Sequence, residues 1–504
     1  MLAPARRRLR KVARWKPDPA PVQEELLKEL VSKGRKTTFG REHGFAAIES
    51  VADYQKRVPL REYLAFKPYW DRLLEGATDV TWPGRISRFA LTSGTTAGNK
   101  LIPVSREGIR SFLRAGRDVL NFYLQATEDT DLFKGKFLYL GGSTELKPAA
   151  HGIQMGDLSG IMAKAMPSFV ERFRLPSAEA NLIPDWEKKL EVVAQESVNA
   201  DVRGISGTPS WVLCLFQRVF EMKRAEGGRA DTLADIWPNL SFMVHGGTSF
   251  EPYRKTFEDL FGKSVQTIEV YPASEGFIAI QDQLDEPDLL LMADTGLFYE
   301  FVPVEEMDKP EPTRLTVANV EKDVQYAVVL TTNSGLWSYV IGDIVRFTSL
   351  RPHRLRVTGR IKQFLNAFGE HLIAEEVENA LTHAAKETDA EVKEFHLAPV
   401  YPSDPRVRPA HQCIVEFTNP PAEPDRFAEV FDARLCAQND DYAAHRKDDA
   451  GLTAPEVIPV PEGTFYETMK SLDKLGGQHK VPRLSNERDF ADQLLEIARA
   501  RQSA

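Results

Sequence analysis

A segment rich in hydroxyls and glycines, residues 92–98, is the first part of the chain whose residue types suggest chemistry. Gly94 and Gly98 frame the segment, and short apolar runs precede and follow it. Its hydroxyl-bearing residues are Thr92, Ser93, Thr95 and Thr96. The pattern predicts a strand, a tight loop and a second strand over residues 86–104. Such a loop can direct backbone N–H groups and hydroxyls at one anion, most often a phosphate.

This loop differs from the Walker A phosphate loop, which has four residues between its glycines and a helix directly behind a Lys-Ser/Thr pair. Here three residues separate Gly94 from Gly98, and Asn99 precedes Lys100. Pro103 follows closely and interrupts any helix at that position. An ordinary turn made of Ser, Thr and Gly residues is the alternative interpretation.

Three further segments occur in a fixed order behind the loop: Tyr-Pro-Ala-Ser-Glu-Gly at 271–276, an apolar stretch with a central Gly-Asp at 338–347, and Val-Thr-Gly-Arg at 357–360. Together with the loop they resemble the signatures of adenylate-forming enzymes. The closer resemblance is to the auxin-responsive Gretchen Hagen acyl-acid amido synthetase family, in its bacterial branch. That family's Ser-Ser-Gly-Thr-Thr-Ser-Gly loop matches residues 92–98. Its Tyr-x-Ser-Ser-Glu element matches 271–275, where Ala273 replaces the first serine.

Two C-terminal strings extend the resemblance, which runs from about Gln23 to the end of the chain. The family's Asp-x-x-Leu, Asn-x-x-Tyr and Arg string is matched by Asp432, Leu435, Asn439, Tyr442 and Arg446. Its final Gln-Tyr-Lys-x-Pro-Arg string resembles residues 478–483.

The resemblance implies an α/β fold in two parts. The first is a large N-terminal α/β domain of the firefly-luciferase-like adenylate-forming type, residues 1–365, which holds the ATP and acyl sites. The second is a small, mobile C-terminal α+β lid domain, residues 366–504. A glycine-containing connection, residues 364–370, is the expected hinge.

The implied activity is that of an ATP-dependent acyl-acid–amino-acid ligase. A carboxylic acid and ATP form an acyl-adenylate and pyrophosphate, and the amine of an amino acid then gives an amide and AMP. The expected cofactors are ATP and Mg2+, and the expected partners are a small carboxylic acid and an amino acid. We expect neither nucleic acid nor membrane as a partner, and a monomer is our expectation for the oligomeric state.

The resemblance assigns roles to the hydroxyl loop and to the segment behind it. The expected phosphate-binding residues are Thr92, Ser93, Thr95, Thr96 and Ser274. Glu275 is expected near the phosphates as the metal ligand and as a catalytic residue, because a hard cation takes carboxylate and phosphate oxygens. A solvated loop carboxylate is the alternative for Glu275. Tyr271 is expected to stack on adenine, although a tyrosine at a strand end often serves packing alone.

Asp343 is expected to accept hydrogen bonds from the ribose hydroxyls, with Arg360 nearby, because an ionised carboxylate is purely an acceptor. The alternative is an ion pair of Asp343 with Arg346 or Arg360 inside one hairpin. His371 is also an expected catalytic residue, and it stands where we expect a lysine near the α-phosphate in plant members. An imidazole is charged only part of the time near neutral pH, so either His371 serves in a weaker role or another cation, Arg360 or Lys480, replaces it.

Lys480 is the remaining cation with an expected catalytic role, because flanking glycines allow its loop to carry a point charge to the phosphates. A solvated surface lysine is the alternative. His245 stands before a double glycine and either lines the acyl pocket or is a satisfied histidine at a strand end.

Alternating strand and helix patterns predict the layers that position these residues. Expected strands of the large domain are 137–140, 201–207, 240–247, 266–271, 326–332 and 338–347. Expected helices are 22–33, 211–220 and a long one capped by Ser105. The small domain is expected to contain strands 391–400, 411–417 and 456–460, and helices starting near 375, 427 and 465.

Composition sets outer limits on function. The chain has 504 residues, 64 Lys and Arg against 73 Asp and Glu, and a net charge of −9, which argues against a nucleic-acid binder. Its three cysteines are scattered, as in proteins of a reducing cytosol, and no apolar run approaches a membrane span. The basic N-terminus is expected to be the solvated start of the first helix, with an organelle transit peptide as the alternative.

Two other classes of function remain open at the level of sequence. An acyl-adenylate-forming enzyme can pass its acyl group to a thiol, either coenzyme A or a protein, and a thiol-dependent product would identify it. A nucleotide-binding homologue without catalysis is the other alternative. The presence of Glu275, Asp343 and Lys480 argues against it.

Overall fold

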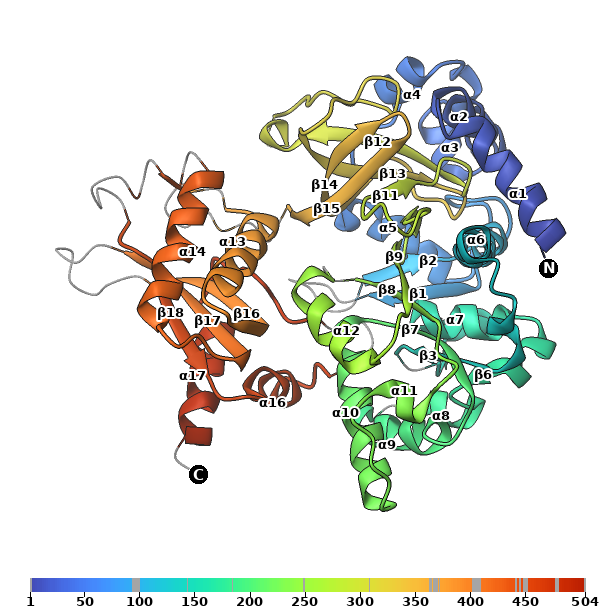
Figure 1. Ribbon diagram of the computed structural model, residues 1–504. Helices are drawn as coiled ribbons and strands as arrows, with labels where there is room; N and C mark the ends of the chain where they lie inside the picture. The colour runs from blue at the N-terminus through green and yellow to red at the C-terminus, as the bar shows by residue number, and fades with distance from the viewer. Residues whose placement is uncertain are drawn as a thin grey trace.

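The computed structural model describes residues 2–92, 100–142, 144–183, 185–247, 250–307, 309–361, 365, 370, 372–400, 409–439, 442–443, 446, 452–475 and 480–502. Figure 1 shows a large part, from α1 to β15, with a smaller part made of the last helices and strands beside it.

In the large part, helices surround the sheets. The helices are α1 (Leu2–Trp15), α2 (Ala20–Gly34), α3 (Thr38–Glu42), α4 (Val51–Arg57), α5 (Tyr63–Leu74), α6 (Arg106–Thr127), α7 (Leu158–Ala165), α8 (Ala178–Leu182), α9 (Trp186–Ser197), α10 (Pro209–Ala225), α11 (Leu233–Ile236) and α12 (Arg254–Phe261). The strands are β1 (Arg88–Thr92), β2 (Lys100–Pro103), β3 (Lys136–Leu140), β4 (Lys147–Pro148), β5 (Gln154–Gly156), β6 (Arg174–Leu175), β7 (Val202–Gly207), β8 (Phe242–Gly246), β9 (Gln266–Ala273), β10 (Gly276–Ile280), β11 (Leu289–Leu291), β12 (Leu297–Pro303), β13 (Gln325–Thr332), β14 (Tyr339–Leu350) and β15 (His353–Arg360).

The main sheet is mixed. Among the described residues it has 11 strands in the order β12-β13-β14-β15-β11-β10-β9-β8-β7-β3-β6. Its β6-β3-β7-β8-β9 half is parallel, as the strand–helix alternation predicts. The other half is antiparallel, which the sequence did not indicate. Hairpins build that half, since antiparallel neighbours need only a short connection.

The first predicted elements are confirmed by their burial. In α2 the apolar stripe of Leu27, Leu30 and Val31 is buried in the main core, where each side chain contributes about 1.5–3 kcal/mol. Helix α6 begins at the predicted cap, because the Ser105 hydroxyl accepts a 2.9 Å hydrogen bond from the Gly108 N–H. The strand pair on either side of the hydroxyl loop is also confirmed, since β1 and β2 are antiparallel neighbours.

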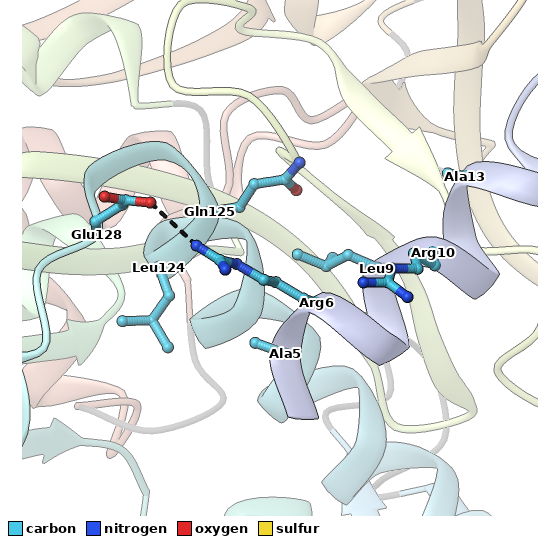
Figure 2. Close-up of a pocket in the computed structure, with 8 residues that line it drawn as sticks. All are labelled: Ala5, Arg6, Leu9, Arg10, Ala13, Leu124, Gln125 and Glu128. Atoms are coloured by element: carbon cyan, nitrogen blue, oxygen red, sulfur yellow. Dashed lines mark hydrogen bonds and ion pairs between the residues drawn. The ribbon is translucent and has the colours of Figure 1, made fainter. Parts of the chain in front are cut away.

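The N-terminal helix α1 is a packed element, so the expectation of a solvated start is wrong for its inner face. Arg8 donates hydrogen bonds of 2.7 Å to Asp118 and 2.8 Å to Asp294, and Val12 and Trp15 are buried. Its outer face does carry exposed basic side chains. Figure 2 shows the cavity of about 370 Å³ between α1 and the end of α6, where Arg6 faces Glu128 at 3.4 Å. No described helix is long and apolar enough to cross a membrane.

The small part is an α+β unit, as the sequence predicts. It contains α13 (Ala374–Glu387), β16 (Glu391–Val400), β17 (Ala410–Asn419), α14 (Pro424–Gln438), β18 (Glu456–Val460), α16 (Thr464–Ser471) and α17 (Asp489–Gln502). The described strands form one sheet of order β16-β17-β18, and α13 and α14 pack together over its core. Helix α17 was not anticipated from the sequence.

Three residues of the C-terminal family string, Asp432, Tyr442 and Arg446, bind one another in this small part. Tyr442 donates a 2.8 Å hydrogen bond to Asp432, and Arg446 binds both oxygens of Asp432 at 2.9 and 2.6 Å. A bidentate pair of this kind fixes geometry as well as charge. The string therefore ties the segment after α14 back onto that helix.

Candidate active site

The candidate site lies where strands from both halves of the main sheet end. The parallel strands β7, β8 and β9 bring their carboxyl ends to the same edge, where α/β proteins bind ligands. The β14–β15 hairpin and Lys480 of the small part approach this edge too. Of the hydroxyl loop, Thr92 is described, half-buried at the end of β1. Ser93, Thr95 and Thr96 lie outside the described residues.

Glu275 sits in the turn that joins β9 to β10. Ala273 pairs with Gly276, so the turn consists of Ser274 and Glu275 alone. A larger residue at Gly276 would force Leu297 to move, because a Cβ would lie 2.4 Å from the Leu297 side chain. Sequence reasoning placed Glu275 after a strand that ends at Tyr271, and the structure extends that strand through Ala273.

The environment of Glu275 raises its pKa to about 7. Burial is the main cause, and the negative charge of Asp343 adds to it, while Arg360 and Lys100 oppose the shift. A carboxyl group with this pKa changes its charge near neutral pH, and a bound cation would hold it in the ionised form. Lys100 itself lies over the Tyr63 ring, its ammonium 5.8 Å from the ring centre.

Asp343 is held by two neighbours. It faces Arg360 across β14 and β15, and Arg360 Nε donates a 2.7 Å hydrogen bond to its Oδ1. The Tyr271 hydroxyl donates a 2.6 Å bond to its Oδ2, and the Tyr271 ring is buried in the main core. The ion pair considered as an alternative for Asp343 is thus present with Arg360, whereas Arg346 pairs with Glu375 at 2.7 Å.

Lys480 reaches this group from the small part. Gly247, directly after β8, has a φ of 91°, and a Cβ there would lie 3.2 Å from Lys480 Cε and 3.4 Å from Nζ. The side chain keeps contact with solvent, yet the surrounding protein lowers the pKa of Lys480 by burial. Asp343 counteracts this effect and Arg360 adds to it, so the ammonium lies within electrostatic reach of both.

His245 lies at the end of β8, two residues before Gly247. Its ring is 3% exposed and stacks on Phe250, with 4.0 Å between ring centres. Burial lowers the pKa of His245 to about 3, so the ring is neutral, and its Nδ1 is without a hydrogen-bond partner among the described residues. The interpretation of His245 as a histidine with both ring nitrogens hydrogen-bonded is therefore wrong for Nδ1. A place of His245 beside the acyl group stays a prediction.

The structure brings together Tyr271, Glu275, Asp343, Arg360 and Lys480, which are up to 209 positions apart in the sequence (480 − 271). Their roles towards a nucleotide stay predictions. His371 lies outside the described residues, as does most of the expected hinge. Lys100 was not singled out from the sequence, although it follows the hydroxyl loop by two positions.

The described residues fit a magnesium ion bound largely through phosphate. No group of three or more His, Cys, Asp or Glu side chains among them converges as a complete metal site. Mg2+ commonly takes one or two carboxylates and completes its shell with phosphate oxygens and water. Glu275 is a carboxylate that could serve as such a ligand, and Arg360 and Lys100 add positive charge around it.

Three family models match the chain in sequence order. They are the GH3 family N-terminal domain over residues 8–266, the GH3 family central domain over 290–360 and the GH3 family C-terminal domain over 375–489. The N-terminal model alone covers more than half of the chain.

Individual relatives match over nearly their whole length. The chain is 22% identical over 535 residues to a jasmonoyl–L-amino acid synthetase of Nicotiana attenuata, JAR4, covering 92% of this chain and 91% of that one. It is 24% identical over 556 residues to an indole-3-acetic acid-amido synthetase of Oryza sativa subsp. indica, GH3.8, covering 92% and 87%. Both relatives come from plants, so the bacterial branch stays a prediction.

A solved structure shares the fold. The AtGH3.15 acyl acid amido synthetase in complex with 2,4-DB superposes with a TM-score of 0.79 at 18% identity, over 97% of this chain and 95% of that one. A 2-hydroxyisobutyryl-CoA ligase in its postadenylation state gives a TM-score of 0.60 at 13% identity, over 96% and 92%. From the N-terminal, central and C-terminal matches together, we conclude that this chain belongs to the GH3 family.

Proposed function

We propose that this protein is an ATP-dependent ligase that joins a small carboxylic acid to an amino acid. The single observation that carries the proposal is the convergence of Asp343, Glu275 and Lys480 at one edge of the sheet. A carboxylate can accept bonds from the ribose, a second carboxylate can hold a cation, and an ammonium can offset phosphate charge. The names of the plant relatives, which are amido synthetases, support the same class of reaction.

In the first half-reaction a carboxylate oxygen of the acid attacks the α-phosphorus of ATP. A phosphorus–oxygen bond forms to the acid, the bond to the β-phosphate oxygen breaks, and pyrophosphate leaves with the electron pair. The protein's contribution is positioning and charge, because the reaction passes through a highly anionic transition state. We assign Asp343 to the ribose hydroxyls, since each of its oxygens still has acceptor capacity beside Arg360 and Tyr271.

We assign five residues to the phosphates. Four belong to the hydroxyl loop, Thr92, Ser93, Thr95 and Thr96, and the fifth is Ser274 of the β9–β10 turn. Glu275 would hold Mg2+, which neutralises phosphate charge when bound. Lys480 brings a second cation to the same region, because its ammonium stands beside Gly247 within reach of the Asp343 charge. We assign Tyr271 to a position next to adenine. Its hydrogen bond to Asp343 would also bring it close to the ribose.

In the second half-reaction the amine of an amino acid attacks the carbonyl carbon of the acyl-adenylate. The new carbon–nitrogen bond forms, the carbon–oxygen bond to the adenylate breaks, and AMP leaves while the nitrogen loses a proton. We propose that residues 1–365 and 366–504 move relative to each other between the two steps. The gap between the central and C-terminal family models, from 360 to 375, fits a boundary at this position.

A screen of carboxylic acids against amino acids tests the proposal. AMP release is recorded for each pair, and mass spectrometry identifies the product. AMP and an amide that depend on both substrates are the expected result. Parallel reactions with coenzyme A in place of the amino acid provide the decisive contrast. A thioester formed instead of an amide would overturn the assignment of the acceptor, and ADP instead of AMP would overturn adenylation itself.

A further inference from the structure

We propose that Tyr253 and Arg483, bridged by Glu394, form an interdomain contact that positions Lys480 over the candidate active site. The three are positioning residues, since none of them reaches the group around Asp343 among the described contacts. The inference rests on the proposed function for its kinetic test, and the contact also has a purely structural readout.

The contact joins the large and small parts of the molecule through buried groups. Tyr253 closes a short 3-10 helix, Glu251–Tyr253, between β8 and α12, and its side chain is 2% exposed. Its hydroxyl donates a 2.6 Å hydrogen bond to Glu394 of β16. Arg483 completes the triangle, because its guanidinium donates to Glu394 at 2.5 Å and to the Tyr253 hydroxyl at 3.1 Å.

The protonation states of the triangle fit this geometry. Burial and the charge of Glu394 raise the pKa of Tyr253 well above its ordinary value, so the hydroxyl stays a donor. The pKa of Arg483 is also raised, because Glu394, Tyr253 and Glu378 outweigh its burial. The guanidinium further lies 4.5 Å from the centre of the Phe395 ring. A buried cation with these partners has little freedom to reorient.

The fixed guanidinium of Arg483 restrains the position of Lys480, because a short stretch of backbone held by hydrogen bonds connects the two residues. The Leu397 N–H donates a 2.9 Å bond to the Arg483 carbonyl, and the Ser485 N–H donates a 3.1 Å bond to the Leu397 carbonyl. The chain thus runs beside β16 like an added parallel strand. Only Val481 and Pro482 separate Lys480 from Arg483, and proline fixes its own φ.

Glu394 and Arg483 both belong to the small part, so the buried Tyr253 hydroxyl is the link of the triangle to the large part. Among the described contacts, the ion pairs that join the two parts are more exposed than this hydroxyl. Lys255 pairs with Glu391 at 2.7 Å and Lys470 with Glu187 at 2.8 Å, with lysine side chains 69% and 45% exposed. Arg346 pairs with Glu375 at 2.7 Å, with the arginine side chain 27% exposed. The two lysine pairs are exposed, and pairs of this kind contribute little to stability. Removal of the Tyr253 hydroxyl takes a buried donor away from the Glu394 carboxylate, which costs more than losing a contact that water replaces. We therefore expect loss of the Tyr253 hydroxyl to affect the docking of the two parts more than loss of either lysine pair.

A double-mutant cycle tests whether Tyr253 acts through Lys480. Tyr253→Phe keeps the buried ring and removes only the interdomain hydroxyl. We expect it to slow ATP–pyrophosphate exchange about tenfold, because small misplacements of a catalytic group are costly. In a Lys480→Ala background the same substitution should change the remaining exchange less than about twofold, because the group it positions is gone. A tenfold loss in both backgrounds, or none in either, would overturn the proposal.

Tyr123→Phe is the matched control. Tyr123 is also buried and its hydroxyl donates a 2.7 Å bond to Asp129, but the contact lies within the large part. This variant should leave exchange unchanged in both backgrounds. Glu394→Gln should reproduce the Tyr253→Phe pattern, since an amide weakens both the tyrosine and the arginine bond.

Small-angle X-ray scattering separates a failure of this inference from a failure of the proposed function, because it needs no turnover. Loss of the buried contact should raise the radius of gyration of Tyr253→Phe and Glu394→Gln above that of the parent protein and of Tyr123→Phe. The scattering test applies even if no acid supports exchange in the parent protein. Identical scattering curves for all four proteins would overturn the interdomain contact.

Discussion

Asp343 and Arg360 face each other across the β14–β15 hairpin, 2.7 Å apart, with the Asp343 carboxylate 13% exposed beneath the half-exposed guanidinium. Tyr271 holds the other carboxylate oxygen at 2.6 Å. A carboxylate offers about four acceptor positions, so two bonds leave capacity for a ribose diol. The two bonds therefore fix the orientation of the carboxylate before a nucleotide arrives.

Replacing Asp343 should weaken ATP and AMP binding alike, because the two nucleotides share the ribose. Hydrogen bonds to a charged group contribute about 1.5–3 kcal/mol, so Asp343→Ala should raise both dissociation constants about tenfold or more. Asp343→Asn should have a smaller effect, since the amide oxygen still accepts. Calorimetric titration with AMP and with a non-hydrolysable ATP analogue measures both constants.

The matched control for that titration is Asp288→Asn. Asp288 is also a buried partner of an arginine on β15, Arg356, but it stands directly before β11, and no described hydrogen bond or ion pair joins it to Asp343 or Arg360. Its substitution should leave AMP binding unchanged. Lost pyrophosphate exchange together with intact AMP binding in Asp343→Ala would place Asp343 away from the ribose.

Glu275 should make the protein less stable as pH rises towards and through neutrality. Its pKa is about 7 in the folded protein and about 4.3 in an unfolded chain. Between these values the unfolded chain has already released its proton while the folded protein still binds one, so the free energy of unfolding falls as pH increases. Glu275→Gln cannot ionise and lacks this decline.

Thermal unfolding at two pH values measures the effect. The melting temperature of Glu275→Gln relative to the parent protein should be higher at pH 8 than at pH 5, and Glu311→Gln, an exposed carboxylate substitution in a loop, should show no such difference. Because metal binding needs the ionised carboxylate, Glu275→Gln should also require more Mg2+ for exchange. An equal change in melting temperature at both pH values would contradict a raised pKa of the partly buried Glu275 carboxyl group.

Lys480 should serve the first half-reaction and not the second. Once the acyl-adenylate exists, pyrophosphate has left and its charge no longer needs a cation. Lys480→Ala should lose most pyrophosphate exchange yet form amide from pre-made acyl-adenylate at a near-normal rate. Lys480→Arg should recover part of the exchange, since a planar fork differs from a compact ammonium. Lys474→Ala, an exposed lysine in the same segment, is the control.

The pH profile gives a second view of Lys480. Burial lowers its pKa, so the ammonium loses its proton below the ordinary lysine value of about 10.4. The kcat/KM for ATP should therefore fall on the alkaline side below that value, and this fall should be absent in Lys480→Arg. Equal loss of both half-reactions in Lys480→Ala would assign the residue to folding or docking instead.

Local patterns predicted the elements of the small part well. The strands over 391–400 and 456–460 coincide with β16 and β18, because apolar residues and turn residues mark their ends. The antiparallel half of the main sheet was not predicted. Its strands are as apolar as parallel ones, since both faces are covered, and residue pattern alone does not reveal strand direction.

The candidate site was predicted through family motifs, and the interdomain triangle was missed for a physical reason. Asp343 and Glu275 stand in recognisable strings, whereas Tyr253, Glu394 and Arg483 owe their roles to partners that are 89 to 230 positions away. Nothing in the residues next to Tyr253 marks its hydroxyl as an interdomain donor. The basic N-terminus shows the same limit, since Arg8 meets Asp294 only in the folded chain.

Oxygen-isotope transfer tests adenylation most directly. An accepted carboxylic acid is labelled with oxygen-18 in both carboxylate oxygens and incubated with ATP and an accepted amino acid. Attack on the α-phosphorus makes one acid oxygen the bridge of the acyl-adenylate, and aminolysis then breaks the bond between that oxygen and the carbonyl carbon. Mass spectrometry should find AMP that carries one labelled oxygen. Unlabelled AMP, or label in inorganic phosphate beside ADP, would contradict an acyl-adenylate.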